Sequence, residues 1–178
     1  MKILAYAGSN SLNSINKQLV TYATTLLPEV GIHDFETLDL NDFDMPLFSV
    51  DKEKELGNPE PAMRFMNKIE ECDALIISLA EHNGTYTVAY KNLFDWASRI
   101  NPHVFQDKAI IYLSTSPGPG GAQSVLAAAV NSAPFFKGHV KGSLSVPLFN
   151  DNFDVETGKL KNNELNEELL DLLHSLKA

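Results

Sequence analysis

Short apolar runs alternate with polar segments and amphipathic stretches along the whole chain. The runs Ile3–Ala7, Ala74–Leu79 and Ala109–Leu113 are continuous, as in strands that are buried on both faces. His33–Leu38 alternates as a half-exposed edge strand does, and a fifth, weaker strand is predicted within Val140–Val146. The pattern therefore predicts five strands.

Amphipathic or alanine-rich segments separate these runs. Helices are predicted over Ile15–Leu27, from about Pro59 onward, over Thr87–Arg99, Ala122–Ala133 and Asn163–Leu176, and residues 39–51 are predicted to form an Asp-rich loop. Strict alternation of strands and helices implies right-handed crossovers. The sequence thus predicts an α/β fold, with a doubly wound, mostly parallel five-stranded sheet in one domain of residues 1–178.

Composition narrows the classes of function. The single cysteine, Cys72, excludes an intramolecular disulfide and any multi-cysteine metal or iron-sulfur site. A net charge of −9 and a pI of about 4.9 oppose binding to nucleic acid or anionic membranes. No charged leader precedes Gly8 and no apolar run reaches membrane-spanning length, so we expect a cytoplasmic protein without a membrane partner.

The loop after the first predicted strand is rich in hydroxyl and amide groups. Ser9, Ser11, Ser14 and Asn16 lie between Gly8 and the body of a helix whose N-terminal amides and dipole favour an anion. The loop carries neither a Walker A sequence nor the glycine fingerprint of dinucleotide sites. We expect it to bind the phosphate of a mononucleotide, and helix capping by the same serines is the structural alternative.

A second polar loop, residues 80–86, offers backbone amides, a carboxamide, a hydroxyl and an imidazole to a planar ligand. Gly84 permits close backbone approach. Glu81 or His82 as a general base would indicate a hydrolase, but no serine or cysteine nucleophile pattern accompanies them. The histidines are scattered without paired ligand spacing, so no metal site is predicted.

A third break, Ser114–Gly121, has little side-chain bulk and exposes backbone amides. It suits the ring or ribityl chain of a ligand, and a tight turn before the next helix is the alternative. Ligands of doubly wound sheets bind outside the carboxyl ends of the strands, so we expect the three loops to form one site. Tyr90, Phe94 and Trp96 stand at helical spacing and indicate core or interface packing.

Together, these loops resemble those of the NAD(P)H-dependent FMN reductase family, which comprises flavodoxin-like quinone, azo-dye and chromate reductases. The similarity spans about residues 2–146. Met45–Phe48 resembles the family's Pro-Leu-aromatic loop, and Glu81–Asn83 followed by Lys91–Arg99 resembles its central signature, of which Lys91–Arg99 is the most specific part. The resemblance implies a flavodoxin-like sheet of order 2-1-3-4-5.

The resemblance also implies FMN as cofactor and NAD(P)H as co-substrate, with ping-pong transfer of electrons to a small acceptor such as a quinone, an azo compound, a free flavin or a metal oxyanion. No side chain is needed as catalytic acid or base. The positions that match the family's FMN contacts are Ser9, Ser11, Ser14, Ile15 and Asn16 for the phosphate, Glu81, His82, Asn83, Gly84 and Thr85 for the ring, Ser116, Gly118 and Gly121 for its other rim, and Pro46, Leu47 and Phe48 as a closing loop.

Three positions depart from the family pattern: Ser11 replaces a common arginine, Ala80 a proline and His82 a tyrosine. An arginine–phosphate contact is worth about 1.5–3 kcal/mol, so we expect looser FMN binding unless Lys17 or helix amides compensate. The imidazole of His82 is expected to tune the flavin potential or the choice of acceptor.

Family members usually form dimers or tetramers, and the aromatic helix 87–99 is the expected surface for a homodimer or homotetramer. Two alternatives to a reductase stay open. One is a non-enzymatic flavodoxin-like electron carrier or flavin-binding protein, which NAD(P)H would not reduce rapidly. The other is a partner-binding module that has lost the flavin, which would not take up FMN.

Overall fold

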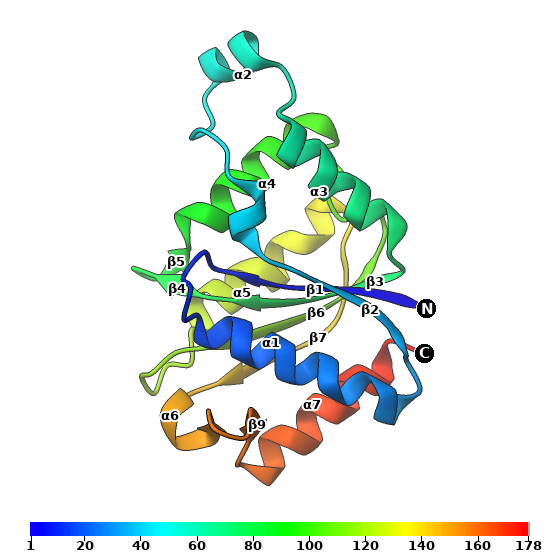
Figure 1. The fold of residues 1–178 in the computed structure, drawn as a ribbon, viewed down its shortest axis with the longest axis vertical. Coiled ribbons are helices and arrows are strands. Elements are labelled where there is room, and N and C mark those ends of the chain that lie inside the picture. Colours follow the sequence, from blue (N-terminus) through cyan, green and yellow to red (C-terminus); the bar gives the residue numbers. More distant parts are fainter. Residues whose placement is uncertain (178) are drawn as a thin grey trace.

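The computed structural model describes residues 1–177 and has a five-stranded parallel sheet at its centre (Figure 1). The strands are β1 (Lys2–Gly8), β2 (Asp34–Leu38), β3 (Ala74–Leu79), β6 (Ala109–Thr115) and β7 (His139–Val146). They lie in the order β2-β1-β3-β6-β7, and every neighbouring pair is parallel. Counted along the chain, this is the predicted order 2-1-3-4-5.

Helices cover both faces of the sheet (Figure 1). On one face lie α3 (Glu60–Glu71), α4 (Val88–Ile100) and α5 (Gln123–Ser132), and on the other lie α1 (Ile15–Leu26) and α7 (Asn163–Ser175). Successive residues of a strand point to opposite faces, so β1 supplies Leu4 to one hydrophobic core and Ile3 to the other. All six residues of β3 are buried, which explains its uninterrupted apolar sequence.

Shorter elements occupy the connections. They are the 3-10 helices η1 (Leu27–Val30), η2 (Leu40–Phe43) and η3 (Ala133–Phe136), the helices α2 (Val50–Leu56) and α6 (Phe149–Asn152), and the hairpins β4 (Glu81–His82) with β5 (Thr85–Tyr86) and β8 (Phe153–Asp154) with β9 (Lys159–Leu160). None of the helices among the described residues has the length and hydrophobicity needed to cross a membrane.

The predicted loop 39–51 is wrong in part, because it contains η2 and the start of α2. The Asp39 carboxylate accepts a hydrogen bond from the Asn41 amide and caps η2, and the Ser49 hydroxyl caps α2 at the Lys52 amide. α2 has no buried residue and projects from the body of the molecule (Figure 1). A helix that buries nothing needs no apolar stripe, so hydrophobic periodicity does not reveal it.

Candidate functional site

The carboxyl ends of three central strands lie side by side. The register pairs Gly8 of β1 with Leu79 of β3, and Leu79 with Ser114 of β6. The segments that follow these strands are the three polar loops singled out in the sequence, and they leave the sheet at one edge (Figure 1). The structure therefore brings the predicted loops together.

The loop between β1 and α1 is built by its own serines. The Ser9 hydroxyl accepts a hydrogen bond from the Ser11 amide, and the Ser14 hydroxyl accepts one from the Lys17 amide and caps α1. Both hydroxyls keep a proton to donate, and the exposed Ser11 hydroxyl has no hydrogen bond within residues 1–177. Capping, the structural alternative, is thus real and leaves the loop open to an anion.

Asn16 lies in the first turn of α1. Its side chain is buried, and its carboxamide accepts from the Ser78 hydroxyl (2.8 Å) and from the Thr115 amide (3.1 Å) and donates to the Thr115 carbonyl (3.1 Å). It ties α1 to the ends of β3 and β6. Ile15 beside it is half-buried against the core under α1.

Lys17 does not face the phosphate loop as a free cation. Its ammonium pairs with the carboxylate of Asp39 at the end of β2. The hydrogen bond from Lys17, joined by those from Asn41, lowers the pKa of the Asp39 carboxyl. The compensation expected for the missing arginine therefore falls to the amides of α1, whose first turn carries no acidic side chain.

The second loop is a β-hairpin of β4 and β5, an element that the sequence prediction missed. Asn83 and Gly84 form its turn with φ of 53° and 78°. Two left-handed residues in sequence make the turn type that suits a two-residue hairpin, for which Asn-Gly is a strong signal. His82, Asn83, Gly84 and Thr85 are all exposed at the site edge.

Two side chains of the hairpin segment anchor it from below. The Glu81 carboxylate accepts a hydrogen bond from the Val125 amide (2.9 Å) in the first turn of α5. The buried Thr87 hydroxyl donates to the Gly8 carbonyl (2.9 Å) and accepts from the Tyr90 amide at the start of α4. Glu81 thus points to α5 and acts here as a brace of the loop.

The third loop is fixed by hydroxyl groups. The Gly121 carbonyl accepts from the hydroxyls of Ser114 (2.7 Å) and Ser145 (2.9 Å), and the Ser116 hydroxyl donates to the Gly118 carbonyl (3.2 Å). Gly121 has a φ of +57°, and a Cβ placed there would lie 2.2 Å from Ser145 Oγ. The tight turn considered in the sequence is present, and it holds Ser116 and Gly118 at the site edge.

The Pro-Leu-aromatic segment is held by α4. The Pro46 carbonyl accepts from Trp96 Nε1 (2.8 Å) and from the Asn92 carboxamide (3.2 Å), whose oxygen accepts from the Phe48 amide (2.8 Å). The Phe48 ring packs edge-on against Trp96 at 5.1 Å. Leu47 between them is exposed. Residues 91–99, the most specific part of the family resemblance, therefore position the Pro46–Phe48 segment.

A pocket of about 520 Å³ opens where these segments meet. Its lining includes Asn10 of the phosphate loop, Asp44 and Leu47 of the segment after η2, His82 of the hairpin and Asn92 of α4. Asn10 and Asp44 are not among the residues predicted to contact the cofactor. Only the structure shows that they line this pocket. The described residues contain no cluster of three or more His, Cys, Asp or Glu side chains placed for a metal ion.

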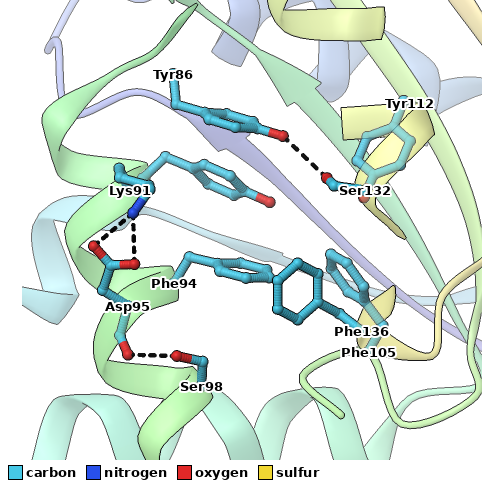
Figure 2. Close-up of a pocket in the computed structure, with 10 residues that line it drawn as sticks. Tyr86, Lys91, Phe94, Asp95, Ser98, Phe105, Tyr112, Ser132 and Phe136 are labelled. Carbon is cyan, nitrogen blue, oxygen red and sulfur yellow. Dashed lines mark hydrogen bonds and ion pairs between the residues drawn. The ribbon is translucent and has the colours of Figure 1, made fainter. Parts of the chain in front are cut away.

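A separate aromatic pocket of about 190 Å³ lies between α4 and α5 (Figure 2). Figure 2 shows Phe94 packed edge-on against Phe136, with ring centroids 4.7 Å apart, and the Tyr86 hydroxyl directed at Ser132 (3.4 Å). Trp96 is fully buried inside the chain. Phe94 is only half-buried and lines the pocket, so self-association through the surface of α4 stays a prediction.

A family model described as NADPH-dependent FMN reductase matches residues 1–152. The chain is 31% identical over 125 residues to a Solanum tuberosum protein named NAD(P)H:quinone oxidoreductase, with 70% of this chain and 63% of that protein covered. It is 32% identical over 125 residues to an Arabidopsis thaliana NADPH:quinone oxidoreductase, with 70% and 62% covered. The chain thus spans less than two thirds of the length of these relatives.

Solved structures show the same fold. A flavoenzyme NAD(P)H:(acceptor) oxidoreductase from Paracoccus denitrificans matches with a TM-score of 0.72 and 21% sequence identity, over 98% of this chain and 94% of that chain. At this identity, the likeness establishes the arrangement of strands and helices.

Proposed function

Because the chain belongs to the NADPH-dependent FMN reductase family, we propose that it is an NAD(P)H-dependent oxidoreductase that holds FMN at the carboxyl edge of its sheet. The electrons pass to a small acceptor, for which a quinone is the first candidate because relatives are named quinone oxidoreductases. The observation that carries the proposal is the meeting of the loops after β1, β3 and β6 at one edge.

The residues at this edge fit a phosphorylated, planar cofactor. α1 begins with free amides, the Ser14 cap and no acidic side chain, which suits a phosphate. A Cβ at Gly84 or Gly118 would have no atom of residues 1–177 within 4 Å, apart from the glycine and its two chain neighbours, so a ring can approach the backbone there.

The site residues then divide into two kinds. We assign direct contacts to Ser9, Ser11 and Ser14 at the phosphate, to residues 82–85 and Ser116, Gly118 and Gly121 around the ring, and to the closing segment 46–48. The second kind holds the loops in place and comprises Ile15, Asn16 and Glu81. The Asn16 carboxamide is hydrogen-bonded to Ser78 and Thr115, and the Glu81 carboxylate to the Val125 amide. Ile15 packs against the core under α1.

Bound FMN supplies the redox chemistry, and turnover is ping-pong because donor and acceptor use it in turn. The chain's part is to orient the ring between the hairpin and the third loop and to stabilise negative charge with backbone amides. No side chain of this edge is required to transfer a proton.

Anaerobic stopped-flow absorbance tests the proposal. The protein loaded with FMN should lose its flavin absorbance within seconds of mixing with NADH or NADPH and regain it on addition of a quinone. Slow bleaching with tight FMN binding would point to an electron carrier instead. Failure to bind FMN in calorimetry would reject the assignment. Assembly as a homodimer or homotetramer stays a prediction, which sedimentation can check.

A further inference from the structure

The aromatic pocket between α4 and α5 is separate from the FMN edge (Figure 2). None of the residues that we assign to FMN lines it, and it shares no lining residue with the 520 Å³ pocket. Its deep wall is formed by the buried side chains of Tyr90, Phe105 and Tyr112. Lys91, which also lines it, is exposed on α4. The pocket therefore reaches from the surface of the molecule into the core.

One end of the pocket is apolar. It is formed by the rings of Phe94, Phe105 and Phe136, which lie together in Figure 2. The centroid of the Phe94 ring is 5.6 Å from that of Phe105 and 4.7 Å from that of Phe136. Aromatic rings pack edge-on or offset against one another, so a further ring suits this end. An apolar cavity of about 150 Å³ holds benzene. The pocket volume of about 190 Å³ therefore has room for one ring with a small substituent.

The other end carries hydroxyl groups. Figure 2 shows Tyr112 and Ser132 on the same side of the pocket, with the Tyr86 hydroxyl directed at Ser132. Tyr112 is only 1% exposed, and its hydroxyl has no hydrogen bond within residues 1–177. Burial raises the pKa of this hydroxyl, so it stays protonated and can donate at neutral pH. An unpaired buried hydroxyl is costly, and the pocket gives a ligand oxygen access to it.

The pocket contains no unpaired charge. Its two charged lining residues, Lys91 and Asp95, pair with each other at 2.6 Å, one turn apart on α4. The remaining lining groups are aromatic rings and hydroxyls. A ligand with a carboxylate or an ammonium group would lose its hydration here without gaining a counter-ion. The site therefore selects a neutral molecule.

We propose that the aromatic pocket binds a neutral monocyclic phenol, whose ring lies against Phe94 and Phe136 and whose oxygen accepts a hydrogen bond from the Tyr112 hydroxyl. The proton of the phenol is donated to the oxygen of Ser132, which gives its own proton to the Ala129 carbonyl (3.3 Å). The inference goes beyond the proposed function, because this site needs neither FMN nor a dinucleotide.

Calorimetry of the full chain with phenol tests the site, in the FMN-free and in the FMN-loaded protein. We expect one phenol per chain with a Kd of about 0.1–1 mM in both forms, as for a ligand of this size in a well-fitting pocket. Toluene has the same shape without the hydroxyl and serves as the matched ligand. Benzoate, which carries a charge, should bind at least about tenfold more weakly than phenol.

Tyr112→Phe removes the hydroxyl and keeps the ring. It should weaken the binding of phenol about three- to tenfold and leave the binding of toluene unchanged. Tyr22→Phe is the matched control, because Tyr22 belongs to the core on the opposite face of the sheet, and it should change neither affinity. Ser132→Leu fills the polar end and should weaken both ligands about tenfold or more, with thermal melting to check that the variant is folded.

No binding of phenol, or equal affinity in the wild-type protein and in folded Ser132→Leu, would overturn the proposal. An equal loss of phenol and toluene binding in Tyr112→Phe would overturn the role of the hydroxyl. Competition between phenol and FMN would place the phenol at the carboxyl edge and reject this site. Dissociation of an oligomer on addition of phenol, measured by sedimentation, would assign the pocket to a second copy of the chain and also overturn the proposal.

Discussion

Single residues at the sheet edge connect several elements through hydrogen bonds that the sequence does not predict. The sequence predicts Asn16 as part of the first loop's site, and in the structure its three hydrogen bonds reach Ser78 and Thr115, which lie 62 and 99 residues away. Such partners depend on the register of β1, β3 and β6. A side chain's partners in another strand cannot be predicted without that register.

Replacing Asn16 with alanine removes those three bonds and leaves the Thr115 amide buried without a partner. We expect the free energy of unfolding to fall by about 2–4 kcal/mol. Urea denaturation of the FMN-free protein measures the change. Asn13→Ala is the control, because Asn13 is exposed in the same loop and its loss should change stability by less than about 0.5 kcal/mol.

Gly121 and Gly120 form a natural pair of substitution sites. Alanine at Gly121 places a Cβ 2.2 Å from Ser145 Oγ at a φ of +57°, so we expect a loss of roughly 1–3 kcal/mol. Gly120 has open space around it and no positive φ, and Gly120→Ala should be neutral. Equal melting temperatures for the two variants would contradict the tight turn described for this loop.

At the scale of elements, the sequence predicts what buries apolar surface and misses what does not. The strands β1, β3 and β6 were identified because both faces of each are covered. The hairpin β4–β5 was missed although Asn83-Gly84 signals it, because each of its strands has only two residues. α2 gave no periodic signal at all.

The contact between α4 and the Pro46–Phe48 segment predicts a local effect. Asn92→Ala removes the acceptor for the Phe48 amide. It also removes the hydrogen bonds that the Asn92 carboxamide donates to the Met45 and Pro46 carbonyls. Hydrogen exchange at the Phe48 amide should speed up by about tenfold or more, as measured by NMR.

Lys91→Ala is the control for this experiment. It breaks only the ion pair with Asp95, in which Lys91 is more than half exposed, so it should change neither the exchange at Phe48 nor stability. If both variants exchange alike, Asn92 does not hold the segment.

For the whole molecule, the parallel sheet and its two helical layers could be predicted because alternation of β and α units leaves few topologies. The order of the strands was predicted from the family resemblance. The approach of the 44–48 segment to α4 could not, because it depends on hydrogen bonds to carbonyls rather than on apolar pattern. The family resemblance identified the segment in the sequence. Only the structure shows that Asn92 and Trp96 of α4 hold it.

A buried thiol in the core beneath α3 makes the free energy of unfolding depend on pH in the alkaline range. Burial raises the pKa of the Cys72 thiol to about 11, so the folded protein keeps the proton after the unfolded chain, with a thiol pKa of about 8.5, has lost it. The free energy of unfolding should therefore fall as pH rises between these values, with a slope of at most about 1.4 kcal/mol per pH unit from this group.

Urea titrations between pH 8 and pH 10 test this dependence, and Cys72→Ala should flatten the slope. Above that range, buried Tyr6 and Tyr112, whose pKa values are also raised by burial, add to the loss. An unchanged slope in the variant would mean that the thiol does not titrate late in the folded protein.

The projecting helix α2 has a consequence for how this chain tolerates alteration. Since α2 buries no residue, its seven residues can be swapped for a flexible spacer or a short peptide tag with little cost to folding. The segment Met45–Phe48, which α4 holds in place, ends just before α2, so an inserted segment would lie next to the site. A fluorophore attached there would report occupancy from outside, without a label inside the pocket.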